Sequence, residues 1–177
     1  MADRVSFSGL HRELPEITTH HQDLVSSLKL YFSAGSPSYL LRFDEYTVTE
    51  VTDELRQRLD ETDLTSSLAV LTSLEAAFRI DYLQRCYRRK KDQVSRAFRK
   101  IYKSKQGRAS LEEEIFIAWA KNSSVPSSII SELRGAFRFR HWLAHGRYWT
   151  PKFGRRYDFM DVFELAELAF NSFPFEL

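Results

Sequence analysis

Apolar residues recur at intervals of three and four along most of the chain, which places them on one face of a helix. The predicted helices are 16–33, a short polar helix from 47, 64–105 as one helix or two in sequence, 113–122, one from 126 onward and 158–173. The stretch 38–46 is ambiguous between a loop and a short extended piece. With only 6 Gly and 5 Pro, the chain suits long helices better than a many-stranded sheet. We therefore predict an all-α fold, an antiparallel bundle of four to six helices.

Capping residues mark where several of these helices begin. Thr47 and Glu50 have the spacing of a capping box, in which each side chain bonds the backbone N–H of the other residue. Ser110 and Glu113 repeat this spacing, and Asp158 is a candidate N-cap for the last helix.

The length of 177 residues fits one continuous domain with a core of its own. Within it, residues 1–60 are predicted to form a helical extension that packs on a bundle made by 61–177. The only cysteine, Cys86, cannot form an internal disulfide, and a structural role is predicted for it. The polar N-terminus predicts no signal peptide, and no apolar run has the length of a membrane span. A cytoplasmic protein without membrane contact is therefore expected.

Charge is distributed unevenly, although the net charge is only +2. Residues 79–108 contain 12 Lys or Arg and two acidic residues, and 134–156 contain seven Lys or Arg and no acidic residue. Residues 1–78 contain 6 basic and 13 acidic residues. Two basic islands on a nearly neutral chain predict a polyanionic partner that binds at these islands. The alternative is that they are only the solvated faces of helices.

A charged residue interrupts the apolar stripe of the helix that begins at 126. Ile130, Leu133 and Phe137 lie along one face, and the next position on that face is Arg140. A buried guanidinium needs a carboxylate, a phosphate or an opening to solvent. Glu75 interrupts the stripe of the longest apolar region in the same way, so the two side chains are expected to meet or to border one polar cavity. A structural salt bridge explains the pair equally well.

Two histidines follow Arg140. His141 and His145 are four residues apart and share a helix face, whereas Arg140 and His145 are five apart, about 140° around an ideal helix. For Arg140 and His145 to converge, the helix must loosen near Gly146, or a second copy of the chain must complete the site. Gly146 suits the position just after a helix C-terminus, where the helix dipole favours a charged imidazole. The alternative is that His145 only caps carbonyl groups there.

The segment 140–145, Arg-His-Trp-Leu-Ala-His, resembles the signature of the HEPN domains (higher eukaryotes and prokaryotes nucleotide-binding), which is Arg, four to six residues, then His. Members often have a polar residue directly after the Arg, as His141 is here. Some also carry an acidic residue followed four positions later by a basic one on an earlier helix, as Glu75 and Arg79 do. The resemblance covers about 64–170. Family toxins that are neutralised by adenylylation have Tyr two residues after the His, where this chain has Arg147.

The resemblance implies a helical homodimer in which both Arg/His pairs line a cleft at the interface, and a metal-independent endoribonuclease of the toxin or phage-defence type. RNA supplies its own nucleophile, so the products would be a 2′,3′-cyclic phosphate and a 5′-OH. His145 would transfer the proton and Arg140 would clamp the scissile phosphate. Glu75 would orient Arg140, and His141 would supply a second proton or a hydrogen bond. No metal or cofactor is expected, and an antitoxin or another regulatory protein is a possible partner.

Basic side chains of the two basic islands and one aromatic side chain are expected to hold RNA through its backbone and an exposed base. They are Arg79, Arg88, Arg89, Lys90, Lys91, Arg138, Arg147 and Tyr148. Two other functions remain open. One is a non-catalytic module of the same fold that binds RNA, a nucleotide or a protein partner through the cleft. The other is a helical interaction protein in which Arg140 and Glu75 form only an ion pair.

Overall fold

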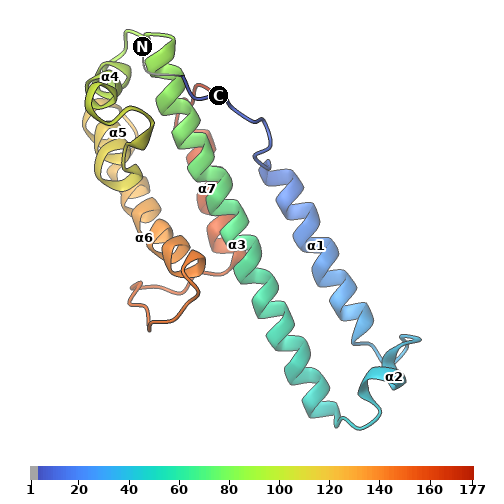
Figure 1. Ribbon diagram of the computed structural model, residues 1–177. Helices are drawn as coiled ribbons and strands as arrows, with labels where there is room; N and C mark the ends of the chain where they lie inside the picture. Colours follow the sequence, from blue (N-terminus) through green and yellow to red (C-terminus); the bar gives the residue numbers. More distant parts are fainter. Residues whose placement is uncertain (1–3) are drawn as a thin grey trace.

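The computed structural model describes residues 4–177, all of whose regular structure is helical, as predicted (Figure 1). Its elements are α1 (Leu14–Tyr31), α2 (Tyr39–Phe43), α3 (Val48–Tyr87), α4 (Gln93–Lys105), the 3₁₀ turn η1 (Gln106–Arg108), the π-helical turn η2 (Leu111–Ile115), α5 (Phe116–Asn122), α6 (Ser127–Ala144) and α7 (Phe159–Ser172). These are seven α-helices rather than four to six. None of those described is long and apolar enough to cross a bilayer. The first residues of the polar N-terminus, on which the signal-peptide prediction partly rests, lie outside the described range.

The helix α3 is one continuous helix over Val48–Tyr87, about 60 Å long. The prediction of a separate short helix from 47 is therefore wrong, because no Gly or Pro interrupts the sequence between those ends. The predicted boundary at residue 60 falls inside α3, so the chain is not divided there. The helix stops before Asp92, whose side chain accepts a hydrogen bond from Ser95 N and caps α4. The region 64–105 is thus two helices in sequence.

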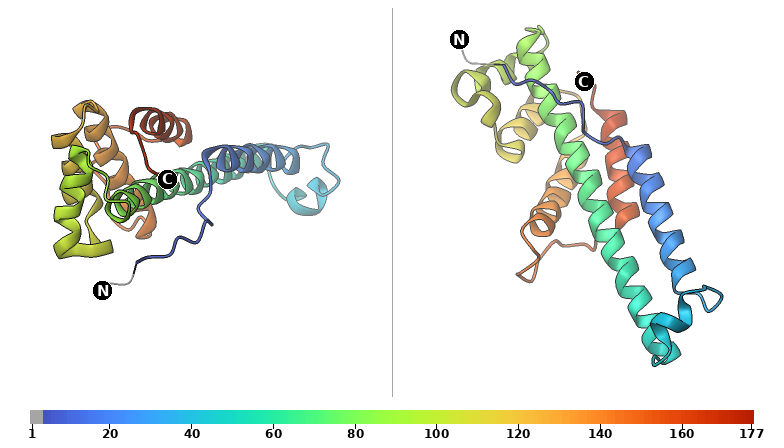
Figure 2. Two further views of the ribbon diagram at one scale, coloured as in Figure 1. Left: turned by 90° about the horizontal axis from the view of Figure 1, so that it is seen from above. Right: turned by 45° about the vertical axis from the view of Figure 1, so that its right-hand side comes forward.

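The other long helices surround α3 (Figures 1 and 2). Helices α1 and α6 run antiparallel to α3, and α7 runs in the same direction as α3. Helices α4 and α5 cover the C-terminal end of α3. The apolar side chains that fill the space between them are fully buried and combine aromatic and aliphatic residues. They include Leu71, Leu74 and Phe78 of α3, Phe98 of α4, Phe116 and Trp119 of α5, Leu133 of α6 and Val162 of α7.

The predicted caps are formed, one of them with a different partner. Thr47 and Glu50 make the capping box of α3, and the side chain of Asp158 caps α7. At Ser110 the side chain accepts from Glu113 N, but the backbone N–H of Ser110 donates to Glu114 Oε2 at 2.7 Å. The wider π-helical turn that follows places Glu114, rather than Glu113, above the Ser110 N–H.

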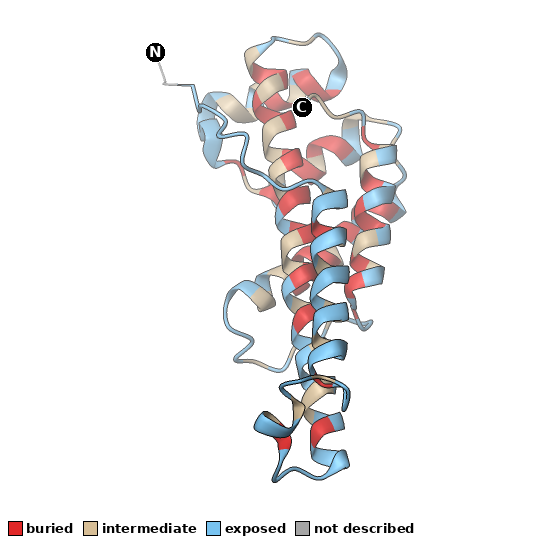
Figure 3. Ribbon diagram, turned by 90° about the vertical axis from the view of Figure 1, so that its right-hand side faces the viewer, coloured by how far each residue is buried: buried red, intermediate tan, exposed pale blue. Residues whose placement is uncertain are grey.

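The end of α1, the helix α2 and the first 12 residues of α3 project beyond the bundle as a two-helix arm, residues 22–59 (Figures 2 and 3). The arm leaves the bundle next to His21, whose ring stacks on that of Phe159 at the start of α7, with centroids 3.8 Å apart. Beyond that level only a small cluster is buried, consisting of Phe32, Phe43 and Val51. The arm therefore has little core of its own.

A buried ionic network fixes the C-terminal residues to α3. Arg85 is 5% exposed, and its Nε donates to Oδ1 of the fully buried Asp81 at 2.7 Å. The same Asp81 oxygen accepts from the backbone N–H of Glu176 at 2.8 Å. Arg85 also donates to the carbonyl of Pro174 and to Asp92 Oδ1. Three separate parts of the chain therefore meet on one guanidinium.

Asp81 is expected to make the stability of the fold depend on pH. Burial raises its pKa from 3.8 to about 6, against the opposing effect of its hydrogen bonds and of Arg85. Because the folded pKa lies above the unfolded one, the contribution of Asp81 to the free energy of unfolding is largest below about pH 4 and is lost as pH rises through about 6. Asp81→Asn should make the free energy of unfolding less dependent on pH in this range, as measured by urea unfolding between pH 4 and 7. An unchanged profile would contradict the assignment.

Candidate functional site

Glu75 joins two arginines on neighbouring helices. Its Oε1 accepts from Arg79 Nε at 2.8 Å, one turn further along α3, and its Oε2 lies 3.1 Å from Arg140 Nη2 on α6. Arg79 is held on its other side by the carbonyl of Ala109, to which its Nη1 donates at 3.2 Å. The two charges that interrupt the apolar stripes thus meet, as predicted. One carboxylate between two guanidinium groups leaves this cluster with an excess positive charge.

The pair borders a pocket of about 410 Å³, so both predicted alternatives, contact and a shared cavity, are found together. Arg140, His141 and Arg134 line it from α6, and Glu75, Glu112 and Glu113 line it from α3 and η2. The side chain of Arg140 is 30% exposed, so part of its guanidinium is open to solvent. Its Nε is buried and has no hydrogen-bond partner within the described chain. The pocket therefore offers cationic groups to an anion, with carboxylates at its opposite wall.

Arg134 was not among the predicted site residues, although it lines the pocket. Its Nη2 donates to the carbonyl of Glu112 at 3.0 Å, which fixes the side chain against η2 at the wall of the pocket. The spacing could have identified it, because Arg134 lies seven residues, or two turns, before His141 and on the same helix face. That face of α6 carries, in order, Arg134, Arg138, His141 and His145.

His145 lies at the very end of α6 as its C-cap. Gly146 follows with φ of +80°, and the N–H groups of Gly146 and Arg147 donate to the carbonyls of Leu143 and Trp142. This is the Schellman arrangement, which confirms Gly146 as the residue after the helix end. The helix does not loosen before His145, and His145 does not line the pocket of Arg140. Within one chain these two residues are therefore not brought into the same pocket.

His141 connects the two regions. It lines the pocket with Arg140, and its ring centroid lies 4.2 Å from that of His145. Both histidines are exposed. Trp149 lies beside His141, with ring centroids 5.9 Å apart. The arrangement places two imidazole groups next to each other at the border of a pocket that contains arginine.

The segment that follows α6 folds back on that helix. Trp142 Nε1 donates to the carbonyl of Trp149 at 2.9 Å, and Trp142 also packs on Phe153. Arg147, predicted to bind RNA, instead forms a two-bonded ion pair with Glu61 of α3, at 2.7 and 3.1 Å. Tyr148 is 83% exposed and is available to an external group.

The remaining predicted RNA-binding residues lie in two places. Arg138 is exposed on α6 and has no ion-pair partner among residues 4–177. The basic run 88–91 forms the turn after α3, about 20 Å along that helix from Glu75. Within it, Arg88 and Lys90 both pair with Glu176, at 3.1 and 3.0 Å, whereas Arg89 and Lys91 are not paired in the described chain. The structure therefore does not bring the run 88–91 to the Arg140 pocket.

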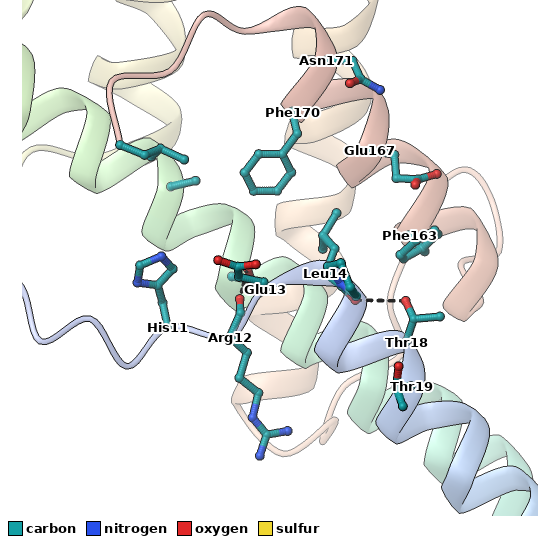
Figure 4. A pocket seen from close by; sticks show the side chains of 14 residues that line it. His11, Arg12, Glu13, Leu14, Thr18, Thr19, Phe163, Glu167, Phe170 and Asn171 are labelled. Atoms are coloured by element: carbon teal, nitrogen blue, oxygen red, sulfur yellow. Dashed lines mark hydrogen bonds between the residues drawn. The ribbon is translucent and has the colours of Figure 1, made fainter.

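A separate pocket of about 640 Å³ lies between the start of α1, α3 and α7 (Figure 4). Its wall is largely apolar and includes Phe163 and Phe170. Polar groups there are used within the fold, since Thr18 Oγ1 donates to the carbonyl of Leu14 and Ser73 Oγ donates to that of Arg12. None of the predicted site residues lies in this pocket.

A reactive cysteine and a metal site are two other kinds of chemistry for which the structure can be examined. Cys86 is buried, and burial raises the pKa of its thiol to about 12, as expected for a structural rather than a reactive cysteine. Among residues 4–177 no three His, Cys, Asp or Glu side chains come together so as to hold a metal ion. Comparisons with models of protein families, with curated proteins and with solved structures give no match for the chain.

Proposed function

We propose that the protein is a HEPN-type, metal-independent endoribonuclease that acts in the cytoplasm as a toxin or phage-defence effector. One observation carries the proposal. Glu75 is shared by Arg79 and Arg140 at an open pocket that His141 also lines, with His145 beside it. A fixed guanidinium next to imidazole groups is suited to metal-independent phosphodiester cleavage, because it offers charge stabilisation beside proton-transfer groups.

Arg140 would hold the scissile phosphate. Glu75 and Arg79 fix its orientation before the substrate arrives, and the excess positive charge of the three groups remains for a phosphate oxygen. As negative charge grows on the phosphate oxygens in the transition state, the guanidinium stabilises it without having to reorient. Arg134 lines the same pocket and would add a second cation.

The histidines would carry out the proton transfers. One imidazole removes the proton of the 2′-OH, and O2′ then attacks phosphorus while the bond from phosphorus to O5′ breaks. The leaving O5′ takes a proton from an imidazolium group. We assign the essential transfer to His145, the histidine of the segment 140–145 that resembles the family signature. The second transfer is assigned to His141, which lines the pocket and whose ring is adjacent to that of His145. In a homodimer whose cleft is closed by the partner chain, His145 of one chain would lie near Arg140 of the other, which binds phosphate.

The test is incubation of the purified protein with end-labelled RNA in EDTA. We expect cleavage that leaves 2′,3′-cyclic phosphate and 5′-OH ends, at a rate that EDTA does not change. Arg140→Ala should abolish it, and Arg138→Ala, one of the exposed arginines of the same helix, is the matched control for general RNA binding. Cleavage that depends on a divalent metal, or that persists in Arg140→Ala, would disprove the mechanism.

The alternative is a non-catalytic module that binds RNA, a nucleotide or a protein partner through the same pocket. It is favoured by one observation, that three carboxylates, Glu75, Glu112 and Glu113, line the pocket against the two guanidinium groups of Arg134 and Arg140. Such a module would bind RNA without cutting it and would be unaffected by His145→Ala. Its binding would fall when the run 88–91 is neutralised, with a smaller dependence on salt.

A further inference from the structure

Exposed apolar side chains are concentrated at the end of the arm, far from the candidate site. Of fourteen exposed large apolar residues in the described chain, six lie within 30–48, where α1 ends and α3 begins. They are Leu30, Tyr31, Leu40, Leu41, Tyr46 and Val48. Leu40 and Leu41, both on α2, are 72% and 91% exposed. We call this segment, residues 30–48, the arm tip.

The arm tip presents a large amount of apolar surface for a single chain. Six side chains of this size and exposure present on the order of 500 Å² of apolar surface, about as much as the largest patches that single soluble chains carry. Two such surfaces placed together would cover on the order of 1,000 Å², near the lower limit of a specific protein interface. The amount of apolar surface is therefore suited to one contact between two copies.

The charges of the tip fit a second copy better than a strongly charged partner. Within 30–48 the chain carries Arg42 and two acidic residues, Asp44 and Glu45. Arg42 already pairs with Glu54 at 3.0 Å. Mixed and nearly balanced charge does not repel a like surface, and it offers little attraction to nucleic acid or to an anionic membrane.

The fold leaves the tip free to meet its own copy. The arm carries the tip beyond the level where α6 ends and α7 begins, so no helix of the bundle lies next to it (Figures 2 and 3). The arm also has only three buried residues in its own cluster, fewer than a stable two-helix unit needs. Pairing of two arms would give a four-helix contact with a larger shared core.

We propose that the arm tip is a self-association surface through which two copies of the chain pack about a two-fold axis, with Leu40 and Leu41 at its centre. This interface is separate from the Arg140 pocket and does not depend on the proposed activity. A dimer through the cleft, if it forms, would be a second and different contact.

Two experiments test the proposal with the full chain. In sedimentation at micromolar concentration, the double variant Leu40→Asp, Leu41→Asp should weaken association at least tenfold, whereas Leu10→Asp, equally exposed but on the N-terminal segment, should not. Thermal melting of each variant checks that the fold is kept. RNA cleavage is measured in parallel, so that loss of activity and loss of association are scored separately.

Site-specific crosslinking gives the second test. The only native cysteine is buried, so a thiol introduced as Leu41→Cys reacts alone with a short bis-maleimide. We expect a covalent dimer from Leu41→Cys at least ten times faster than from Leu10→Cys. Equal crosslinking rates from Leu41→Cys and Leu10→Cys would overturn the proposal, whether or not a dimer through the cleft survives in the double aspartate variant.

Discussion

His145→Ala is expected to lower the rate of RNA cleavage by a factor of about 10²–10⁴, which is the usual loss when a positioned proton-transfer group is removed. The fold should be unaffected, because His145 is exposed and its hydrogen bond at the end of α6 is made by its backbone N–H. RNA binding should also be retained, since the arginines of the pocket remain. The measurement is single-turnover cleavage of a labelled RNA, with binding followed separately by filter retention.

Two further variants sharpen this result. His20→Ala is the matched control, because His20 is an exposed histidine of α1 away from the pocket. His141→Ala tests whether the two histidines share the proton transfers. Under the proposed mechanism this variant should also lose much of the cleavage rate, because His141 lines the pocket itself. A His145→Ala enzyme that cleaves at the wild-type rate would remove His145 from the mechanism.

Arg85→Ala should cost about 3–5 kcal/mol of folding free energy, the usual effect of removing one partner of a buried ion pair. The substitution leaves Asp81 as an unpaired buried carboxylate and takes a hydrogen bond from the carbonyl of Pro174. It also removes the guanidinium that lies 5.0 Å from the ring centroid of Trp119. Urea unfolding followed by far-UV circular dichroism measures the loss.

The control for this prediction is Arg88→Ala, directly after the end of the same helix and also bonded to the C-terminal residues, but exposed. Its cost should stay within about 1 kcal/mol. If Arg85→Ala does not fold at pH 7, measurement near pH 5 provides a second test, since Asp81 can then be protonated and the cost should shrink. A cost below about 1 kcal/mol at both pH values would show that the network is not needed for stability.

The fold was predictable where local sequence decides structure. Apolar spacing identified the helices, and Thr47 and Asp158 marked two of their beginnings. The continuity of α3 was missed because its first half is polar and its stripe is weak, and its packing against α1 becomes visible only in three dimensions. The short α2 was missed because five residues give too few turns for a periodic signal.

The site was predictable only in part. Glu75 and Arg140 could be paired from sequence, because each puts a charge where an apolar residue belongs and opposite charges on packed helices attract. The ion pairs of Arg147 with Glu61 and of Arg88 with Glu176 join residues more than 80 positions apart, and no local pattern indicates them. Pairs of this kind, between distant residues, are therefore found only once the chain is folded.

The unbroken α3 has a consequence for how the protein can vary. It connects the arm tip and the pocket as a rigid spacer, holding Val48 and Glu75 about 40 Å apart. Each residue added to a helix changes its length by about 1.5 Å and rotates everything beyond it by about 100°. An insertion of two residues in the arm would therefore turn the tip to nearly the opposite side. Insertions or deletions that keep the relative orientation of the tip and the pocket are expected near multiples of seven residues, about two helical turns. A length change of the same size would be needed in α1.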